Sequence, residues 1–349
     1  MKNIIAYRIR NARKLQLLSQ QEVANEVGVS KQMISKYEKG ESIPDSSKLI
    51  KLANLFGQKV DYFFRAFKVE LGEVSFRKKS SFSQKRQDSL KEWIKIKLEN
   101  YLYLEETLSI DSSFDNIIAN NTIHSIEDIE KAVLKLRNTW NIGMDPVHNI
   151  IQILEDKEIK VIELDVADAE FDGLACFVDN KYPVIVVNHN FPVERKRFTL
   201  LHELAHLLLN FPNCDTKTEE QFCNKFASAF LLPKKIMIED LGNKRKNISQ
   251  QELIAIQKKY GISIQAIFYR LVDAKILSKA QLKKFFQKIN DNPKLKEDID
   301  SSRFETLEYS DRYERLVYRA VSEENITVSK ASSLLNKDIN SIKEDLAKI

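Results

Sequence analysis

Residues 198–209 read Phe-Thr-Leu-Leu-His-Glu-Leu-Ala-His-Leu-Leu-Leu, and this stretch decides the fold of the middle of the chain. The apolar surroundings predict a buried helix over residues 193–210 with one polar line into a cleft. His202 and His206 are one helical turn apart, so they point the same way. Two imidazoles at this spacing can occupy two corners of a zinc tetrahedron. Glu203 can take the proton of a water molecule that the ion has activated.

The third metal ligand has more than one candidate. A catalytic zinc ion needs three protein ligands and one open position. The connector over residues 211–218 contains Pro212 and should end the first helix, and a second helix is expected over residues 218–232. Its first turn carries Glu219 and Glu220, and either carboxylate could reach the ion. Spacing alone does not choose between them.

Other roles for these residue types stand beside this prediction. Cys214 or Cys223 could supply the third ligand, although Cys223 falls at an apolar helix position. The His-Glu-x-x-His pattern could also arise by chance on a core helix that holds no metal. His189 follows a predicted strand, and it is either a plain surface residue or a residue that lines the cleft and aids the oxyanion.

The segment around the histidines has a mixed pattern. A helix is expected over residues 126–140, and another after Pro146. Short β-type runs follow at residues 159–164, 174–178 and 184–187. Asp179-Asn180-Lys181 suits the turn between the last two runs. The pattern predicts a small sheet among helices.

This segment, from about Ser125 to Pro233, resembles the ImmA/IrrE metallopeptidase family in several separated motifs. The matching features are the Asp172-Gly173 turn, the strand Val184 to Asn188, Arg197-Phe198-Thr199, the His-Glu-x-x-His helix, Glu220-Gln221-Phe222-Cys223-Asn224 with Phe226-Ala227, and Leu231-Leu232-Pro233. The resemblance spans about 110 residues, which makes it more specific than the histidine motif alone. It implies an α+β, zincin-like metallopeptidase domain.

The same resemblance implies a ligand set. The family's third ligand is the glutamate four residues before the asparagine, so Zn²⁺ would be held by His202, His206 and Glu220. Leu201 stands where the family commonly has Ala, and Asn210 stands where it commonly has His. Neither position is a proposed ligand.

Near the N-terminus, two short helices are predicted on either side of a glycine. Ser19 can cap a helix whose third residue is Glu22, which is a capping box. Gly28 permits the left-handed backbone that ends this helix. Ser30 then caps a second helix over residues 31–39. Two short helices joined in this way are typical of a helix-turn-helix.

Residues 3–64 resemble the lambda-repressor-like, Xre-type family. The matching residues are Arg10, Arg13, Ser19-Gln20, Ala24, Gly28-Val29-Ser30, Ile34-Ser35, Glu38, Gly40, Pro44 and Leu52-Ala53. The resemblance implies that the second helix enters the major groove of a double-stranded DNA operator, with a possible homodimer on two half-sites. The residues that would then face bases or phosphates are Lys31, Gln32, Ser35 and Lys36. Gln20 would contact the backbone or a base, and Arg13 and Glu38 would form an internal ion pair; the alternative is a helix-turn-helix used only for protein contact.

The charge of the chain is uneven. The 349 residues carry a net charge of +5, but residues 1–100 contain 21 Lys or Arg and 11 Asp or Glu, a balance of +10, so the remainder sums to −5. A basic front end on a near-neutral body favours a nucleic-acid module fused to another domain.

Composition excludes several classes of protein. Hydrophobic residues make up 43% of the chain, which suffices for a packed core, and the 8 Gly and 7 Pro favour long helices over a turn-rich β fold. No apolar run is long enough for a membrane span, and the N-terminus lacks the apolar region of a secretory signal. Three cysteines without a paired motif suggest reduced thiols in a cytoplasmic protein.

We therefore expect a mainly α protein with a small β-sheet. It should consist of an all-α helix-turn-helix domain (1–66), a basic and helical connector (67–125), a zinc metallopeptidase core (126–233), a helical extension of that core (234–290) and a helical C-terminal region (291–349). Further helix-turn-helix-like patterns around Gly261 and over residues 328–342 are expected to serve packing rather than DNA binding, because they lack a basic face.

The two resemblances together imply a transcriptional regulator whose zinc endopeptidase domain, with Glu203 as the catalytic residue, cleaves an Xre-type repressor or its own linker. The alternative is a transcription factor or antitoxin whose peptidase-like domain senses a signal or binds a partner, such as a toxin, without turnover. No membrane partner is expected.

Overall fold

The computed structural model describes residues 2–66, 69–72, 83–119, 121–165, 171–301 and 303–347. Much of the polar, basic stretch that begins the predicted connector, residues 75–88, lies outside the described residues. The chain forms two compact units. Unit 1 comprises residues 1–72, 78–111 and 313–349, and unit 2 comprises residues 73–77 and 112–312. The domain limits expected from the sequence remain predictions.

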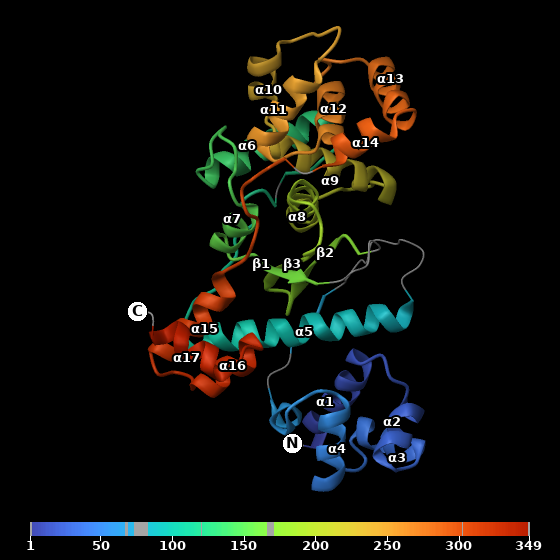
Figure 1. Ribbon diagram of the computed structural model, residues 1–349, viewed down its shortest axis with the longest axis vertical. Coiled ribbons are helices and arrows are strands. Elements are labelled where there is room, and N and C mark those ends of the chain that lie inside the picture. Colours follow the sequence, from blue (N-terminus) through green and yellow to red (C-terminus); the bar gives the residue numbers. More distant parts are fainter. Residues whose placement is uncertain are drawn as a thin grey trace. The chain divides into compact units, whose positions relative to one another are not determined.

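Unit 1 begins with short helices around a common core. They are α1 (Lys2–Leu15), α2 (Gln20–Val27), α3 (Lys31–Lys39), α4 (Ser46–Leu55) and the 3₁₀ helix η1 (Val60–Phe64) (Figure 1). The predicted capping box is confirmed, because the Ser19 hydroxyl accepts from the backbone N–H of Glu22 and the Glu22 carboxylate accepts from that of Ser19. Gly28 ends α2 with a φ of 75°. The core contains Ile9, Val23, Ala24, Val27, Ile34 and Leu52.

The remainder of unit 1 is also helical. It consists of α5 (Gln84–Thr107), α15 (Arg312–Ser322), α16 (Val328–Leu335) and α17 (Ile339–Ala347). Arg8 of α1 and Glu99 of α5 form an ion pair of 2.5 Å whose two side chains are buried. The last three helices pack on α5 through Tyr101, Leu104, Val317, Ala331 and Ile342, among others. The pattern over residues 328–342 thus serves packing, at least through its buried face.

Unit 2 contains the predicted small sheet. Its strands are β1 (Lys160–Leu164), β2 (Gly173–Val178) and β3 (Tyr182–Asn188), in the order β1-β3-β2. β1 runs parallel to β3, with Val161 opposite Ile185, and β2 runs antiparallel to β3. Asp179 and Asn180 form the hairpin turn with φ of 51° and 53°, as the sequence predicts for these turn residues. β2 is therefore an edge strand.

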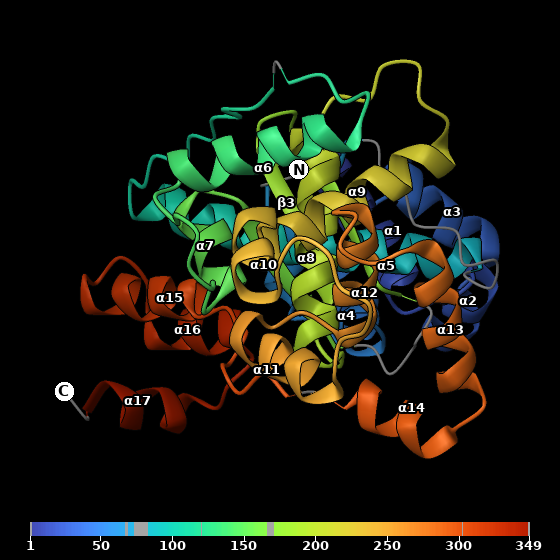
Figure 2. The same ribbon diagram turned by 90° about the horizontal axis from the view of Figure 1, so that it is seen from above.

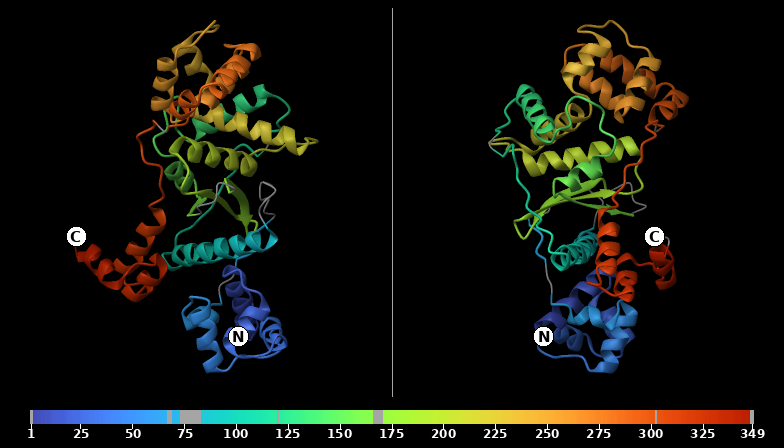
Figure 3. Two further views of the ribbon diagram at one scale, coloured as in Figure 1. Left: turned by 45° about the vertical axis from the view of Figure 1, so that its right-hand side comes forward. Right: turned by 90° about the vertical axis from the view of Figure 1, so that its left-hand side faces the viewer.

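The other described elements of unit 2 are helices. They are α6 (Ile126–Thr139), α7 (Ile150–Asp156), α8 (Val193–Leu208), α9 (Thr216–Leu231), α10 (Lys234–Leu241), α11 (Gln250–Tyr260), α12 (Ile264–Asp273), α13 (Lys279–Asn290) and α14 (Pro293–Asp300). α8 lies across one face of the sheet, against β2 and β3 (Figure 3). α9 packs on α8, and α10 to α14 gather on the side of these two helices that faces away from the sheet (Figures 1 and 2). The expected fold class, mainly α with a small sheet, is confirmed.

The helix predicted over residues 193–210 is two residues too long at its end. α8 ends at Leu208, because Leu209 is extended, with φ −97° and ψ 148°. Asn210 instead forms a parallel bridge with Thr122, and its carbonyl accepts from the N–H of Ile123. A hydrogen bond to a remote segment replaces the next helical turn.

An extended segment, residues 303–311, follows α14 and is fastened to α8. Glu194 accepts hydrogen bonds from the backbone N–H groups of Arg303 and the residue after it, at 2.7 and 3.1 Å. Arg197 and Glu308 form an ion pair of 2.7 Å in which both side chains are fully buried. Burial raises the pKa of Glu308 and lowers the pKa of Arg197, so burial disfavours the charged form of each side chain. Each charge is stabilised by the opposite charge of its partner.

Candidate metal centre and nucleic-acid interface

The two histidines that are predicted to bind a metal, His202 and His206, lie in the middle of α8, a largely buried helix of unit 2. His202 is 0% exposed, whereas His206 is partly exposed. The apolar residues of the same helix, Leu200, Leu201, Leu204 and Ala205, are completely buried in the core. This packing fixes the position of α8, and the two imidazoles lie on the face of the helix that the core does not cover with apolar side chains.

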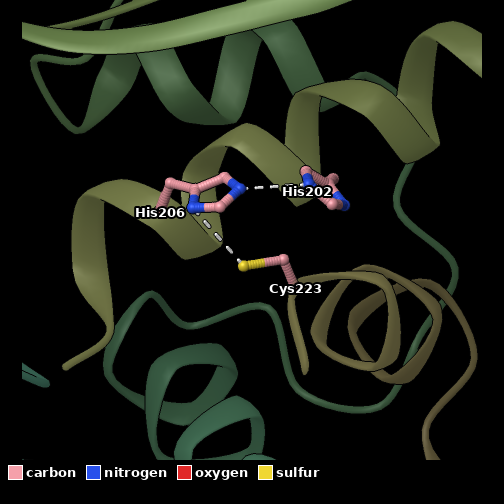
Figure 4. A group of neighbouring side chains, drawn as sticks. All are labelled: His202, His206 and Cys223. Carbon is pink, nitrogen blue, oxygen red and sulfur yellow. Dashed lines mark hydrogen bonds between the residues drawn. The ribbon is translucent and has the colours of Figure 1, made fainter. Parts of the chain in front are cut away.

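The two imidazoles converge. The Nε2 atoms of His202 and His206 are 3.1 Å apart (Figure 4). Two nitrogens bound to one tetrahedral zinc ion at ~2.0–2.1 Å would lie roughly 3.3 Å apart. The separation in the structure is close to that value, so both rings are arranged for a common ion.

Glu220 of α9 approaches the same point. Its Oε1 lies 3.2 Å from Nε2 of His206, and its Oε2 lies 3.4 Å from Nε2 of His202. The three groups thus form a triangle with sides of similar length. Two imidazoles and one carboxylate are the ligand set of several catalytic zinc sites, so the donors fit the ion.

The other nitrogen of each imidazole has its own partner. Nδ1 of His202 lies 2.9 Å from Oδ1 of Asn224, and Nδ1 of His206 lies 3.2 Å from Oε1 of Glu219. Since an amide or carboxylate oxygen can only accept, each Nδ1 carries the proton in these bonds and each Nε2 has its lone pair for an ion. Glu219 and Glu220 are therefore on opposite edges of the His206 ring.

Cys223 lies near the same ring but on the Nδ1 edge. Its Sγ is 3.7 Å from Nδ1 of His206, and the side chain is fully buried (Figure 4). Together with His202 and His206 it forms a group whose donor atoms lie within 4.8 Å of one another. The imidazoles, however, converge through Nε2, which faces Glu220. The geometry therefore favours Glu220 over the thiol as the third donor.

Glu203 is buried beside the sheet. It is 3% exposed, and the helix turn that carries it lies against β2 at Gly173. A Cβ at Gly173 would meet Cγ2 of Thr199 at 2.7 Å, the Val186 carbonyl oxygen at 3.0 Å and Cγ of Glu203 at 3.3 Å. Glycine therefore allows α8 to approach the edge strand.

Acidic side chains give the site a negative potential. Burial opposes the charge of His206, but the hydrogen bond to Glu220 and the charges of Glu203, Glu220 and Glu219 outweigh burial, so the pKa of His206 is raised. The same negative groups would attract a divalent cation. The Nδ1 atom of His189 lies 3.2 Å from Oε1 of Glu163, and the side chain is 56% exposed, so its role in the cleft stays a prediction.

The predicted DNA-contact residues differ in their exposure and in their contacts within the domain. Lys31, Gln32 and Lys36 of α3 are exposed, and Ser35 is half-buried. Gln20 donates from Nε2 to Oε2 of Glu38 at 2.7 Å, so its amide group already has a partner within the domain.

The predicted ion pair under α3 is present. Arg13 holds Glu38 through two bonds of 2.5 and 3.1 Å. Because Glu38 also accepts from Gln20, one carboxylate links α1, α2 and α3. This link joins the two helices of the motif to each other and to α1.

Three residues around the candidate metal site have a role that the sequence did not predict. The sequence offers Glu219 only as an alternative ligand, and Asn224 and Gly173 only as positions that match the family. Glu219 and Asn224 hold the imidazoles, and Gly173 lets α8 approach the sheet. A signal for Asn224 was available, because it lies one helical turn after Glu220 and so shares its face. For Glu219 and Gly173 no local pattern indicates which neighbour they meet.

Comparison with known proteins locates both modules. Residues 9–63 match the helix-turn-helix family, and residues 154–272 match the family described as the IrrE N-terminal-like domain. An uncharacterized transcriptional regulator in the ATPase CF(0) region of Rhodospirillum rubrum is 37% identical over 60 residues. That match covers 17% of this chain and 56% of the relative, so the chain spans about half the length of the relative it matches.

Two solved structures align along nearly the whole chain. The apo form of ComR from S. thermophilus covers 100% of both chains at 11% identity, and ComR from Streptococcus suis covers 98% of this chain and 94% of its own at 13% identity. Their TM-scores are 0.18 and 0.17, so the likeness bears on neither fold nor function. Among the described residues, no helix is both long and apolar enough to cross a membrane. By its two matched segments, the chain is a fusion of an Xre-like helix-turn-helix domain with a later IrrE/ImmA-like domain.

Proposed function

We propose that this protein is a DNA-binding transcriptional regulator whose second module is a zinc-dependent endopeptidase acting on a repressor-type protein or on the protein itself. The observation that carries the proposal is the triangle of His202, His206 and Glu220, with sides of 3.1 to 3.4 Å, in a chain that begins with a helix-turn-helix domain.

In this proposal His202, His206 and Glu220 hold zinc, and Asn224 and Glu219 orient the two imidazoles. A bound zinc ion supplies Lewis acidity, which polarises a peptide carbonyl and makes a water molecule more acidic. Glu203 would hold the proton of the attacking water and deliver it to the leaving amine. Its buried position beside the edge strand β2 supports this role.

Metal analysis of the purified full chain tests the ligand set. We expect about one zinc per chain in the wild type and in Cys223→Ser, and loss of most zinc in Glu220→Ala. The Glu219→Ala variant should still bind zinc, but more weakly, because Glu219 orients the imidazole of His206 and does not bind the ion itself. Loss of zinc in Cys223→Ser with retention in Glu220→Ala would overturn this assignment.

Proteolysis is tested with Xre-type proteins encoded near the gene, and with the chain itself, in the presence of zinc. A new fragment should appear with the wild type and disappear with Glu203→Gln, whose zinc content should be normal. Equal cleavage by wild type and Glu203→Gln would eliminate the peptidase proposal. Zinc-dependent binding of a partner or toxin without any fragment would favour the alternative regulator or antitoxin without turnover.

DNA binding is tested by the salt dependence of affinity for an operator selected from random sequence. Each of Lys31→Ala and Lys36→Ala should reduce the slope of log K against log salt by about 1 if the lysine contacts a phosphate. Gln32→Ala should relax the base preference at one position while it leaves the slope nearly unchanged. Lys275→Ala, an exposed lysine of unit 2, is the matched control.

A further inference from the structure

Unit 2 contains a cavity of about 940 Å³ that the metal site does not use. It lies among α8, α9, α11, α12 and α14, on the side of α8 and α9 away from the sheet (Figure 1). Its lining residues include Phe198, Asn224, Ser228, Gln257, Tyr269 and Ile299. Small-molecule sites have volumes of roughly 300–1,000 Å³, so the cavity can hold a ligand of several dozen atoms at most.

The charged side chains of the cavity wall all have polar partners. Asp300 accepts a hydrogen bond from Nε2 of Gln265 at 2.6 Å. Lys225 contacts Asp273 at 2.6 Å, and Arg195 contacts Asp172 at 2.7 Å. Glu194 accepts from the amide of Gln257 and from the backbone of the segment after α14. An ionic ligand would compete with these partners for the charged groups, so the wall favours an uncharged ligand.

The apolar part of the wall is aromatic. Phe198 of α8 is half-buried, and Tyr269 of α12 is 54% exposed although it is a large ring. Ile299 of α14 lies between the helices and is 3% exposed. Rings and a branched side chain on three elements suit a ligand with an apolar body.

Gln257, a residue of the cavity wall, has a side-chain oxygen without a hydrogen-bond donor among the described residues. Gln257 is 2% exposed, and its Nε2 donates to Oε1 of Glu194 and to the carbonyl of Ser301. These two bonds fix the orientation of the amide. Its Oε1 is buried and has no hydrogen-bond partner among the described residues. A ligand with an N–H or O–H group would complete it.

Asn224 connects the cavity with the metal site. Its side chain is part of the cavity wall, and its Oδ1 accepts from Nδ1 of His202. We propose that this cavity binds a small, uncharged effector with an apolar body and at least one N–H donor, and that the effector acts on the metal site through Asn224. The second half of this inference rests on the proposed zinc site, whereas the first half does not.

Binding is tested on the metal-free full chain by isothermal titration with N-acetyl-L-phenylalaninamide, which is uncharged and carries a ring and N–H donors. The fully N-methylated analogue, which keeps the ring and has no N–H, should bind at least about tenfold more weakly. Ala266→Trp places a ring in the cavity and should abolish binding. Ala347→Trp, on an exposed residue of α17, should bind as the wild type does.

The outcomes separate the two halves of the inference. Saturable binding that Ala266→Trp removes, and that raises or lowers zinc affinity in the wild type but not in Asn224→Ala, supports both. The same binding in a chain that takes up no zinc sinks the metal proposal and leaves the cavity site standing. No saturable binding to the wild type, or equal binding by Ala266→Trp, overturns the cavity site. Equal affinity for the N-methylated analogue overturns the role of Gln257.

Discussion

At the scale of single residues, the proposed metal site includes groups that would not contact the ion themselves. Asn224 and Glu219 hold the Nδ1 edges of the two imidazoles, and Gly173 makes room for the helix that carries them. Substitution of residues that orient metal ligands typically weakens metal binding by about 10- to 100-fold.

Asn224→Ala should weaken zinc binding by about 10- to 100-fold without unfolding the chain, because Asn224 is exposed and its lost contact is the bond to His202. The measurement is a competition titration with a chelator of known affinity. Gln221→Ala, on the same exposed side of α9, is the control and should leave the zinc affinity unchanged. An unchanged affinity in Asn224→Ala would show that His202 needs no such support.

Gly173→Ala should lower the free energy of unfolding of unit 2 by about 1–3 kcal/mol, because the new methyl group is forced against Thr199 and the Val186 carbonyl. Chemical denaturation of the metal-free chain measures it. Adding Thr199→Ser removes Cγ2, the nearest clashing atom, and should restore part of the loss. A wild-type stability in Gly173→Ala would mean that α8 can shift at no cost.

At the scale of elements, local capping fixes the boundaries of most helices. Ser19, Ser30 and Asp45 each accept a backbone N–H at the start of an N-terminal helix, and Gly28 and Gly40 end two of them in the left-handed conformation. Because these capping signals act over only three or four residues, they can be recognised in the sequence alone. The end of α8 shows the limit of such signals, since Asn210 leaves the helix to pair with a remote residue.

The cap of α2 should make its stability depend on pH. Hydrogen bonds from the Ser19 N–H and hydroxyl lower the pKa of Glu22. A carboxylate with a lowered pKa stabilises the fold fully above its unfolded pKa of ~4.3, and this stabilisation is lost as the pH falls through the lower folded pKa. We expect the difference in melting temperature between wild type and Glu22→Gln to be largest near neutral pH and to shrink toward about pH 3. Thermal scans from about pH 7 to about pH 3 measure it, and a constant difference would contradict the prediction.

At the scale of the molecule, the chain contains two compact units, and the three proposed zinc ligands all belong to unit 2. Ligand binding stabilises only states that hold the ligand, by roughly 2.7 kcal/mol at a hundredfold excess over the dissociation constant. Zinc should therefore slow hydrogen exchange in peptides from α8 and α9, and it should leave peptides from α2 and α3 unchanged. Exchange mass spectrometry with and without a chelator tests this, with Glu220→Ala as the control that should show no response. Equal protection of both units would indicate that they unfold together.

The sequence by itself determined the helices of the N-terminal motif, the hairpin turn at Asp179-Asn180, and the shared face of His202 and His206, because each follows from backbone and side-chain geometry within a few residues. Only the tertiary structure decided which carboxylate faces the Nε2 atoms and which faces Nδ1, since Glu219 and Glu220 are adjacent in the chain and their directions depend on how α9 packs on α8. It also decided the burial of Arg197 against Glu308, which lies 111 residues away. Contacts of this kind depend on the relative position of whole elements, and no local pattern of residues carries that information.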